Sequence, residues 1–245
     1  MPARLRWLTA QVVELIDETP RAKSLLLSIP GWSRHRPGQH VDVRLTAEDG
    51  YQAQRSYSIA SAPEADHVML TVDRIEEGEV SPYLTRDVQV GDRFELRGPI
   101  GGYFVWTAAI GGPLFLVAGG SGIAPLMAMV RDWAGGGVST PLMLVCSART
   151  WGELAFGEEL ERIEASRADF RFVAAITRGP GHRPADRTQR LDAPALKELI
   201  AQWGRVPRHV FVCGSNRFVE GVTRGLPDAS LPAGMIRTER YGGAE

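Results

Sequence analysis

A glycine-rich segment follows directly after a short apolar run near the middle of this 245-residue chain. Leu114 to Ala118 predicts a buried strand, and Gly119-Gly120-Ser121-Gly122-Ile123-Ala124-Pro125 leads from it into an amphipathic stretch. A strand-to-helix turn made of glycines lets the backbone approach a pyrophosphate, whose charge the helix N-terminus stabilises. The segment ends in proline where the dinucleotide fingerprint ends in glycine, so a tight turn without a ligand is the alternative interpretation.

A second glycine turn, Gly214-Ser215-Asn216, follows the apolar run His209 to Cys213. In a doubly wound sheet whose first and fourth strands are neighbours, the two turns would flank one crevice at the topological switch point. Their convergence there favours a bound dinucleotide. Cys213 would lie over that crevice, although a small buried hydrophobe is an equally good interpretation of a single cysteine.

The residues after the second strand of this half bear on which dinucleotide fits. Sites selective for NAD usually place Asp or Glu there, where the carboxylate would repel a 2′-phosphate. This chain has Ser147 and Arg149 instead, and a hydroxyl beside a guanidinium suits a phosphate dianion. The pattern favours NADPH, with NADH as the alternative, and Glu153 at the start of the next predicted helix would weaken the preference. Four arginines follow the third strand: Arg178, Arg183, Arg187 and Arg190. Three interpretations fit them: an extension of this positive edge, a docking surface for an acidic protein, or a solvated loop.

Arg55-Ser56-Tyr57-Ser58 is the most informative segment of the first half. Alternate side chains of a strand share a face, so Arg55 and Tyr57 point one way while Ser56 and Ser58 point the other. An ordinary amphipathic strand has the same period, so the period alone assigns no ligand.

The elements that would position these residues differ between the two halves. The first hundred residues are rich in short β-branched and aliphatic runs separated by turn residues, which predicts a small antiparallel barrel. We expect its strands at residues 7–16, 22–29, 39–46, 54–60, 67–73 and 93–98. One short helix, Tyr83 to Asp87, interrupts them, with Ser81 as N-cap and Pro82 at its first position.

After Trp106, apolar runs alternate mostly with amphipathic stretches, which is typical of a parallel sheet covered by helices. The strands are expected at residues 114–118, 141–146, 170–176, 209–213 and 235–238, and the helices at 122–134, 153–165, 192–202 and 215–224. Gly111-Gly112-Pro113 breaks the chain between the two patterns. The sequence thus predicts an antiparallel β-barrel domain, residues 1–108, followed by a doubly wound α/β domain, residues 109–245.

Composition excludes several classes of partner. The 28 basic and 29 acidic residues nearly cancel, which argues against nucleic acid or an anionic membrane as a partner. The five histidines show no paired metal-ligand spacing, and Cys146 and Cys213 are too few for an iron–sulfur cluster. We expect any such cluster or haem on a separate polypeptide. No signal-peptide pattern follows the N-terminus and no apolar run could span a bilayer, so we expect a cytoplasmic protein without membrane insertion.

These segments together resemble the ferredoxin–NADP reductase superfamily. Arg55-Ser56-Tyr57-Ser58 is similar to its Arg-x-Tyr-Ser flavin motif. Other segments agree in order and spacing over nearly the whole chain: Pro37-Gly38-Gln39-His40, Gly78-Glu79-Val80-Ser81, Gly98-Pro99-Ile100-Gly101, Gly120-Ser121-Gly122-Ile123-Ala124-Pro125 and Val212-Cys213-Gly214. The resemblance implies a Greek-key barrel that binds FAD and an α/β domain that binds NAD(P)H.

The resemblance also implies roles for individual residues. Arg55 would pair with the flavin pyrophosphate, Tyr57 would lie against the isoalloxazine or bond a ribityl hydroxyl, and Ser58 would bond near flavin N5. Ser56 belongs to the same motif, and the backbone N–H groups of Gly78 to Ser81 would bind the pyrophosphate, which favours FAD over FMN. In the second domain, Ser121 and Cys213 would border the nicotinamide. The neighbouring glycines Gly120, Gly122 and Gly214 complete that expected site.

The C-terminal segment Ile236 to Gly242 resembles the tail of related reductases in which an aromatic residue approaches the flavin. Tyr241 would shield the flavin face that nicotinamide must reach. Four residues follow Tyr241, unlike members that terminate on the aromatic residue, and a frayed end is the alternative interpretation.

The implied activity is transfer of a hydride from NADPH, or NADH, to FAD and then of electrons to a separate redox protein such as a ferredoxin or an oxygenase component. Two alternatives are a ferric or free-flavin reductase with a small-molecule acceptor, and a non-catalytic FAD-binding subunit that relays electrons inside a complex. Family members of the last kind often carry a cysteine-ligated cluster, for which this sequence has too few cysteines.

Overall fold

Six antiparallel strands form the first half of the computed structural model, which describes residues 5–137, 139–224, 226 and 231–241. The strands are β1 (Leu8–Asp17), β2 (Ala22–Ser28), β3 (His40–Thr46), β4 (Gln52–Ser58), β5 (Val68–Asp73) and β6 (Arg93–Ile100), and their order in the sheet is β4-β3-β6-β1-β2-β5. β6 lies between β1 and β3, so the chain follows a Greek-key path rather than a simple meander.

The two edge strands of this sheet approach each other and close the barrel. Ile59 forms an antiparallel bridge with Leu70, and the Ala60 N–H donates to the Met69 carbonyl at 2.8 Å. Aliphatic side chains from alternate strand positions fill the interior, as the period-2 pattern requires. The predicted antiparallel barrel is confirmed.

A short helix, η1 (Tyr83–Asp87), lies between β5 and β6 with π-type hydrogen bonding. Its bounds agree with the sequence prediction, but the predicted N-cap by Ser81 is absent. The Ser81 hydroxyl accepts the N–H of Ile75 at 3.0 Å instead of capping the helix. Ser81 thus stabilises the turn before the helix, a tertiary detail that the Ser-Pro pair could not reveal.

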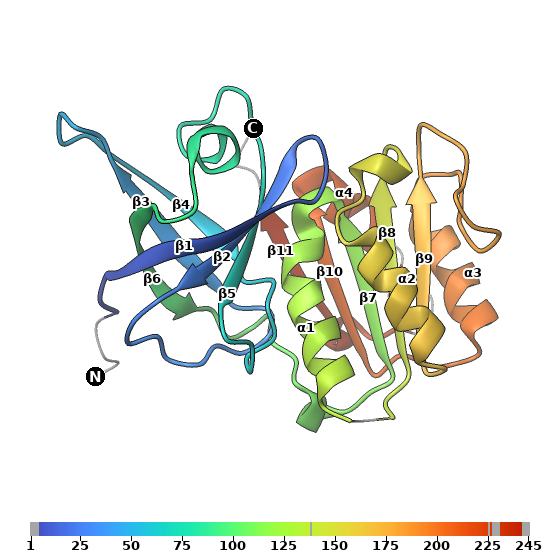
Figure 1. The fold of residues 1–245 in the computed structure, drawn as a ribbon. Helices are drawn as coiled ribbons and strands as arrows, with labels where there is room; N and C mark the ends of the chain where they lie inside the picture. The colour runs from blue at the N-terminus through green and yellow to red at the C-terminus, as the bar shows by residue number, and fades with distance from the viewer. Residues whose placement is uncertain (1–4, 138, 225, 227–230, 242–245) are drawn as a thin grey trace.

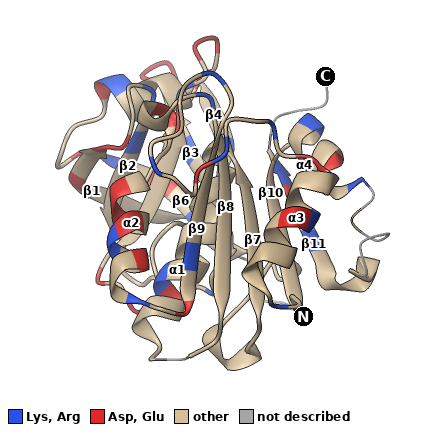
Figure 2. Ribbon diagram, turned by 90° about the vertical axis from the view of Figure 1, so that its right-hand side faces the viewer, with Lys and Arg blue, Asp and Glu red and all other residues tan. Residues whose placement is uncertain are grey.

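The second half is a five-stranded parallel sheet in the order β11-β10-β7-β8-β9. Its strands are β7 (Leu114–Gly119), β8 (Leu142–Ala148), β9 (Phe170–Ile176), β10 (His209–Ser215) and β11 (Ile236–Tyr241). β7 and β10, the first and fourth strands of this half, are neighbours as the sequence argument requires. Figure 2 shows charged residues on the surrounding helices and loops, whereas β7 and β8 carry none.

Four helices cover the two faces of this sheet: α1 (Ile123–Gly135), α2 (Gly157–Ser166), α3 (Ala193–Trp203) and α4 (Asn216–Thr223). α1 and α2 pack on one face through Leu126 and Leu160, and α3 and α4 on the other through Leu196 and Val219 (Figure 1). The doubly wound arrangement is therefore confirmed. No helix among the described residues has both the length and the apolar character needed to cross a bilayer.

The start of α2 corrects the sequence prediction. Glu153 lies in a 3₁₀ turn, η4 (Trp151–Glu153), and the α-helix begins only at Gly157. Phe156 adopts a left-handed backbone conformation with φ of 62° while its ring is buried in the core. Burial of that aromatic ring offsets the backbone strain and ends the 3₁₀ segment before the helix starts.

The two halves share packing contacts at their junction. Phe104 and Trp106, after the last barrel strand, are buried against the α/β core, and the Phe104 ring meets Phe211 edge-on at 5.1 Å. Arg131 of α1 donates to the Ala60 carbonyl at 2.7 Å while its guanidinium also binds Glu159. These contacts fix the barrel against one side of the sheet, where Figure 1 shows α1 between them.

Candidate functional site

The two glycine turns touch each other at the carboxyl ends of β7 and β10. A Cβ placed on Gly122 would lie only 2.3 Å from the Cys213 carbonyl oxygen and 2.8 Å from the Gly214 nitrogen. Only glycine allows backbones to come this close. The two turns therefore converge as the sequence predicted, and their contact requires glycine at position 122.

Phe218 and Tyr241 cover these turns. The Phe218 ring packs on Gly119 and Gly214, where an added Cβ would meet it at 2.6 and 2.5 Å. The Tyr241 hydroxyl donates to the Gly119 carbonyl at 2.6 Å, and a Cβ on Gly120 would approach that hydroxyl at 2.9 Å. Through Tyr241, the C-terminal strand is thus docked against the first glycine turn, while Gly242 and the residues after it lie outside the described part of the chain.

A cavity of about 580 Å³, the barrel cavity, opens between the barrel and the ends of these strands. Its barrel wall includes Arg55 to Ser58 and Gly78 to Ser81, and its opposite wall includes Ser121, Gly122, Cys213 and Tyr241. Its volume is in the range of small-molecule and cofactor sites. Residues far apart in sequence, which the sequence analysis grouped by motif, thus share one cavity.

The side chains of the Arg-x-Tyr-Ser segment divide between the two faces of β4. Arg55 is half exposed and pairs with Glu79 at 2.7 Å, and the Tyr51 hydroxyl donates to the same carboxylate at 2.6 Å. The Ser56 hydroxyl donates to Asp42 at 2.6 Å, and that carboxylate also accepts from Arg97. Arg55 therefore presents a guanidinium at the cavity wall, whereas the hydroxyl of the exposed Ser56 is engaged by Asp42.

Gly78 closes a tight turn that starts at Ile75, at the edge of the barrel cavity. Its N–H donates to the Ile75 carbonyl at 2.9 Å, so the turn itself uses that donor. Glu79, Val80 and Ser81 continue along the cavity wall. The sequence analysis expected four backbone donors here, and the structure shows that Gly78 serves the fold of the turn.

A second cavity of about 320 Å³, the turn cavity, lies over the first glycine turn. Its walls include Gly119 to Ser121, Ser147 at the end of β8, and three residues that follow β8 or β9, namely Arg149, Glu153 and Thr177. The two cavities meet, because Thr71, Asp73, Ser121 and Tyr241 line both of them. Ligands in the two cavities would touch at these four residues.

Two of the four arginines after β9 are engaged in structural contacts. Arg183 binds Asp186, Glu164 and the Phe172 carbonyl at 2.8, 2.9 and 3.0 Å. Arg187 pairs with Glu198 at 3.0 Å. Arg178 and Arg190 are exposed, and none of the four lines the turn cavity. Arg149 is consequently the cation that the second domain contributes to this cavity.

Sequence reasoning missed two titratable groups in the barrel cavity, Glu239 of β11 and His40 of β3. Burial raises the pKa of Glu239 to about 7, and its Oε2 atom is buried without a hydrogen-bond partner among the described residues. The His40 Nδ1 atom lies 3.9 Å from Glu239 Oε1, and burial lowers the pKa of this histidine. The register that pairs Glu239 with Cys213 depends on the sheet, so no local motif could have shown it.

Burial also keeps the candidate groups around Glu239 protonated. The pKa values of the Cys213 thiol and the Tyr57 and Tyr241 phenols are all raised, in each case chiefly by burial. Cys213 is only 3% exposed. Near neutral pH, this cavity therefore holds a thiol and two phenols as neutral groups and one carboxyl group poised to titrate.

Comparison with known proteins gives a separate family match for each half of the chain. The model of the oxidoreductase FAD-binding domain matches residues 22–105, and that of the oxidoreductase NAD-binding domain matches residues 116–224. A cytochrome P450 reductase of Amycolatopsis superposes with a TM-score of 0.84 at 27% identity, covering 98% of this chain and 71% of that one. A ferredoxin NADP⁺ reductase from Neisseria gonorrhoeae with bound FAD and NADP has the same fold, with a TM-score of 0.79, 22% identity and coverage of 97% and 99%.

Curated relatives extend beyond this chain. The ferredoxin reductase component of a Mycobacterium tuberculosis 3-ketosteroid-9-alpha-monooxygenase is 29% identical over 96% of this chain, which covers 65% of that protein. The reductase subunit of a Chromohalobacter salexigens glycine betaine monooxygenase is 32% identical over 94% of this chain, which covers 63% of that protein. The chain thus spans slightly less than two thirds of these relatives. It carries an oxidoreductase FAD-binding domain followed by an oxidoreductase NAD-binding domain, and it shares its fold with a ferredoxin NADP⁺ reductase.

Proposed function

We propose that this chain is an FAD-dependent NAD(P)H reductase that passes electrons to a separate acceptor, such as a ferredoxin or an oxygenase component. The observation that carries the proposal is the meeting of the barrel cavity and the turn cavity at Ser121 and Tyr241. Hydride transfer requires donor and acceptor atoms to be held almost in contact. Two adjoining cavities, each lined by residues of both domains, supply that arrangement without an acid or base catalyst.

The barrel cavity fits FAD by the chemistry of its walls. Arg55 offers an exposed guanidinium to the pyrophosphate, and Glu79, Val80 and Ser81 bring the backbone alongside it. Tyr57 supplies an aromatic surface and Ser58 a hydroxyl at the end of β4. The buried Oε2 of Glu239 adds a polar group that a ligand in this cavity can satisfy.

The barrel cavity would hold FAD, and the flavin would supply the redox chemistry, namely hydride acceptance and release of single electrons. The protein contributes position and exclusion of water. Ser121 and Tyr241 line both cavities, Cys213 lies in the wall of the barrel cavity, and Glu239 can hold or release a proton near neutral pH. Ser58, Cys213 and Tyr241 are the residues that we assign to the reacting rings.

The turn cavity fits the nicotinamide dinucleotide. Gly120 lets the pyrophosphate approach the N-terminus of α1, and Gly122 and Gly214 keep the two glycine turns close together. Ser147 and Arg149 form the pocket for a 2′-phosphate, which favours NADPH over NADH. Glu153 lies in the same cavity and opposes that preference.

The relatives support a separate protein acceptor over the other two activities, because several of them are reductase components of oxygenases. We propose a division of the chain at residues 1–108 and 109–245, which falls between β6 and β7. We also propose a cytoplasmic location, where NADPH is available.

Anaerobic mixing of the FAD-loaded protein with NADPH or NADH tests the activity and the nucleotide preference together. We expect the flavin absorption band to bleach, with a lower half-saturating concentration for NADPH. Turnover with an artificial one-electron acceptor should follow when oxygen is excluded. A flavin that stays oxidised with both nucleotides contradicts the proposal and favours a passive relay subunit, while turnover confined to ferric complexes or free flavin favours the small-molecule alternative.

A further inference from the structure

The barrel forms one wall of the turn cavity, opposite the glycine turn of β7. Thr19, Arg21, Ala22, Thr71 and Asp73 come from the barrel strands β2 and β5 and from the turn before β2. Among the residues that line this cavity, Arg21 and Arg149 are the two arginines, one from each domain. Any ligand on the glycine turn therefore faces a cation from the barrel as well.

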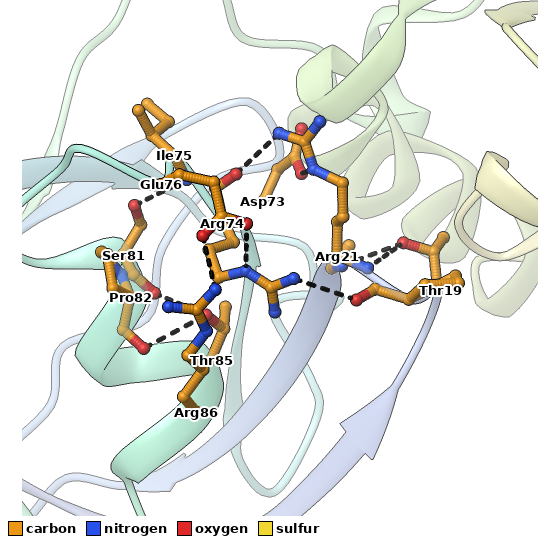
Figure 3. A network of polar contacts seen from close by, with 12 residues as sticks. Thr19, Arg21, Asp73, Arg74, Ile75, Glu76, Ser81, Pro82, Thr85 and Arg86 are labelled. Carbon is orange, nitrogen blue, oxygen red and sulfur yellow. Dashed lines mark hydrogen bonds and ion pairs between the residues drawn. The ribbon is translucent and has the colours of Figure 1, made fainter.

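The backbone around Arg21 is held on both sides. Thr19 Oγ1 accepts the N–H groups of Arg21 and Ala22 at 3.2 and 2.9 Å, and the Arg21 carbonyl accepts the N–H of Arg74 at 2.9 Å. The Arg21 guanidinium donates to the Arg74 carbonyl at 2.7 Å, which sets its direction (Figure 3). The cation is thus placed by backbone contacts rather than left as a free surface side chain.

The guanidinium keeps donors for the cavity. Its Nε atom lies 3.8 Å from Asp73 Oδ1, which is too long for a hydrogen bond, and 44% of the Arg21 side chain is exposed. A guanidinium has five N–H donors, and the Arg74 carbonyl accepts from one of its nitrogens. Several donors are consequently available to a phosphate group, which can accept two hydrogen bonds from one guanidinium.

The position of Arg21 distinguishes it from Arg149. Asp73, its neighbour, lines both cavities together with Ser121 and Tyr241, so Arg21 lies near the point where the cavities meet. Arg149 follows β8, the next strand along the sheet. Asp73 and Glu153 place two carboxylates in the same cavity, and these would repel an anionic ligand. Arg21 and Arg149 offset that repulsion from the two sides of the cavity.

We propose that Arg21 donates to the pyrophosphate of the nicotinamide dinucleotide from the barrel side, so that the ligand is held between the two domains. The proposal rests on the proposed function of the turn cavity and adds the contribution of the barrel to nucleotide affinity. The two arginines then bind different groups. Arg21 binds the pyrophosphate, which NADPH and NADH share, and Arg149 binds the 2′-phosphate, which only NADPH carries. Arg21 is a binding residue in this scheme and takes no part in the hydride step.

Calorimetric titration of the FAD-loaded protein with ADP-ribose and with adenosine 2′-monophosphate separates these contacts without turnover. ADP-ribose contains the pyrophosphate and lacks the 2′-phosphate, whereas the second probe has the opposite composition. Arg21→Gln should weaken ADP-ribose binding by roughly 10- to 100-fold, the range for loss of a charge-assisted hydrogen bond, and leave the second probe unchanged. Arg149→Gln should show the reverse, and Arg21→Lys should recover part of the ADP-ribose affinity.

Arg86→Gln is the matched control, because Arg86 is a half-exposed arginine of the same polar network that pairs with Glu76 outside both cavities. It should bind both probes as the parent protein does. Unchanged ADP-ribose affinity in Arg21→Gln, or equal losses with both probes, would overturn the proposal even if NADPH still bleaches the flavin. Absence of bleaching in the parent protein would instead reject the proposed function itself, and the two failures are thereby distinguished.

Discussion

The two cavities are built from different parts of the polypeptide. Side chains of β4 and of the segment before η1 form the barrel wall, with Arg55, Tyr57 and Ser58 at successive or alternate strand positions. Glycine backbone forms the floor of the turn cavity, and the second glycine turn and Tyr241 press against it. The barrel therefore recognises its ligand through groups that can be removed, and the α/β domain through space that can be filled.

This difference determines which substitutions are informative. Truncating a side chain tests a group on a cavity wall, whereas adding a single carbon tests the close packing of the glycine turns. Each of the following changes is aimed at one region, so an effect on the other region would argue against the comparison.

Gly122→Ala should have the largest effect. The new Cβ would meet the Cys213 carbonyl oxygen at 2.3 Å, so the two turns must separate and the nucleotide site must distort. We expect kcat/KM for NADPH to fall by roughly 100-fold or more, because displacement of about 1 Å at a reacting geometry has an effect of this size. Gly135→Ala, at the end of the same helix with nothing within 4 Å of its Cβ, is the matched control.

Arg55→Ala should weaken the barrel site. Loss of the cation facing a pyrophosphate should raise the Kd for FAD by roughly 10- to 100-fold, and the purified protein should be largely colourless. The flavin-to-protein absorbance ratio and a titration with FAD measure the loss. Arg93→Ala removes an exposed barrel arginine outside both cavities and should retain FAD fully; equal flavin content in the two variants would refute the role of Arg55.

Arg149→Ala should affect the reaction with NADPH more than the reaction with NADH. We expect kcat/KM to decrease by roughly tenfold for NADPH and to change little for NADH, because only NADPH carries the 2′-phosphate. Steady-state rates with both nucleotides, measured on the same preparation, check this. Equal losses with both would show that Arg149 does not read the 2′-phosphate.

Cys213→Ala should have a smaller effect at the meeting point of the cavities. The thiol is buried and neutral, so its contribution is packing beside the reacting rings rather than ionic chemistry. Single-turnover reduction should slow by a factor of about 3 to 10 while FAD stays bound, as expected for a modest loss of positioning. An unchanged rate would leave Cys213 as a small buried hydrophobe.

Glu239→Gln should alter how the free energy of unfolding depends on pH. The pKa of Glu239 is raised from 4.5 to about 7, so the folded protein holds a proton that the unfolded chain has released between these values. The free energy of unfolding should therefore fall as pH rises from 4.5 through 7, and the variant should lose this dependence. Thermal unfolding at pH 5 and pH 8 measures it, and parallel Tm changes in both proteins would contradict the assignment.

Much of the architecture could be predicted because it depends on local pattern. The strand runs, the glycine turns and the placement of β7 beside β10 agree with the structure. The prediction failed where a tertiary contact competes with a local signal. The buried ring of Phe156 delays the start of α2, and the hydroxyl of Ser81 bonds Ile75 rather than capping η1.

The arginines show the same limit for the site. Arg183 and Arg187 carry the same charge in the sequence as Arg149, yet acidic partners from other elements engage them in structural contacts. Arg21 has no motif around it, and its place in the turn cavity follows from the path of the barrel strands. Residue type states what a side chain can bind, but its partners decide whether it is available.

The sequence by itself determined the two kinds of domain, the order of their elements and the turns that must contain glycine, since these follow from side-chain period and backbone sterics within a few residues. Tertiary structure alone decided that β11 places Glu239 beside Cys213 and His40, and that a barrel arginine faces the glycine turn of the other domain. Such neighbours are separated by tens to hundreds of residues along the chain. Their proximity arises from strand register and domain packing, which no local pattern encodes.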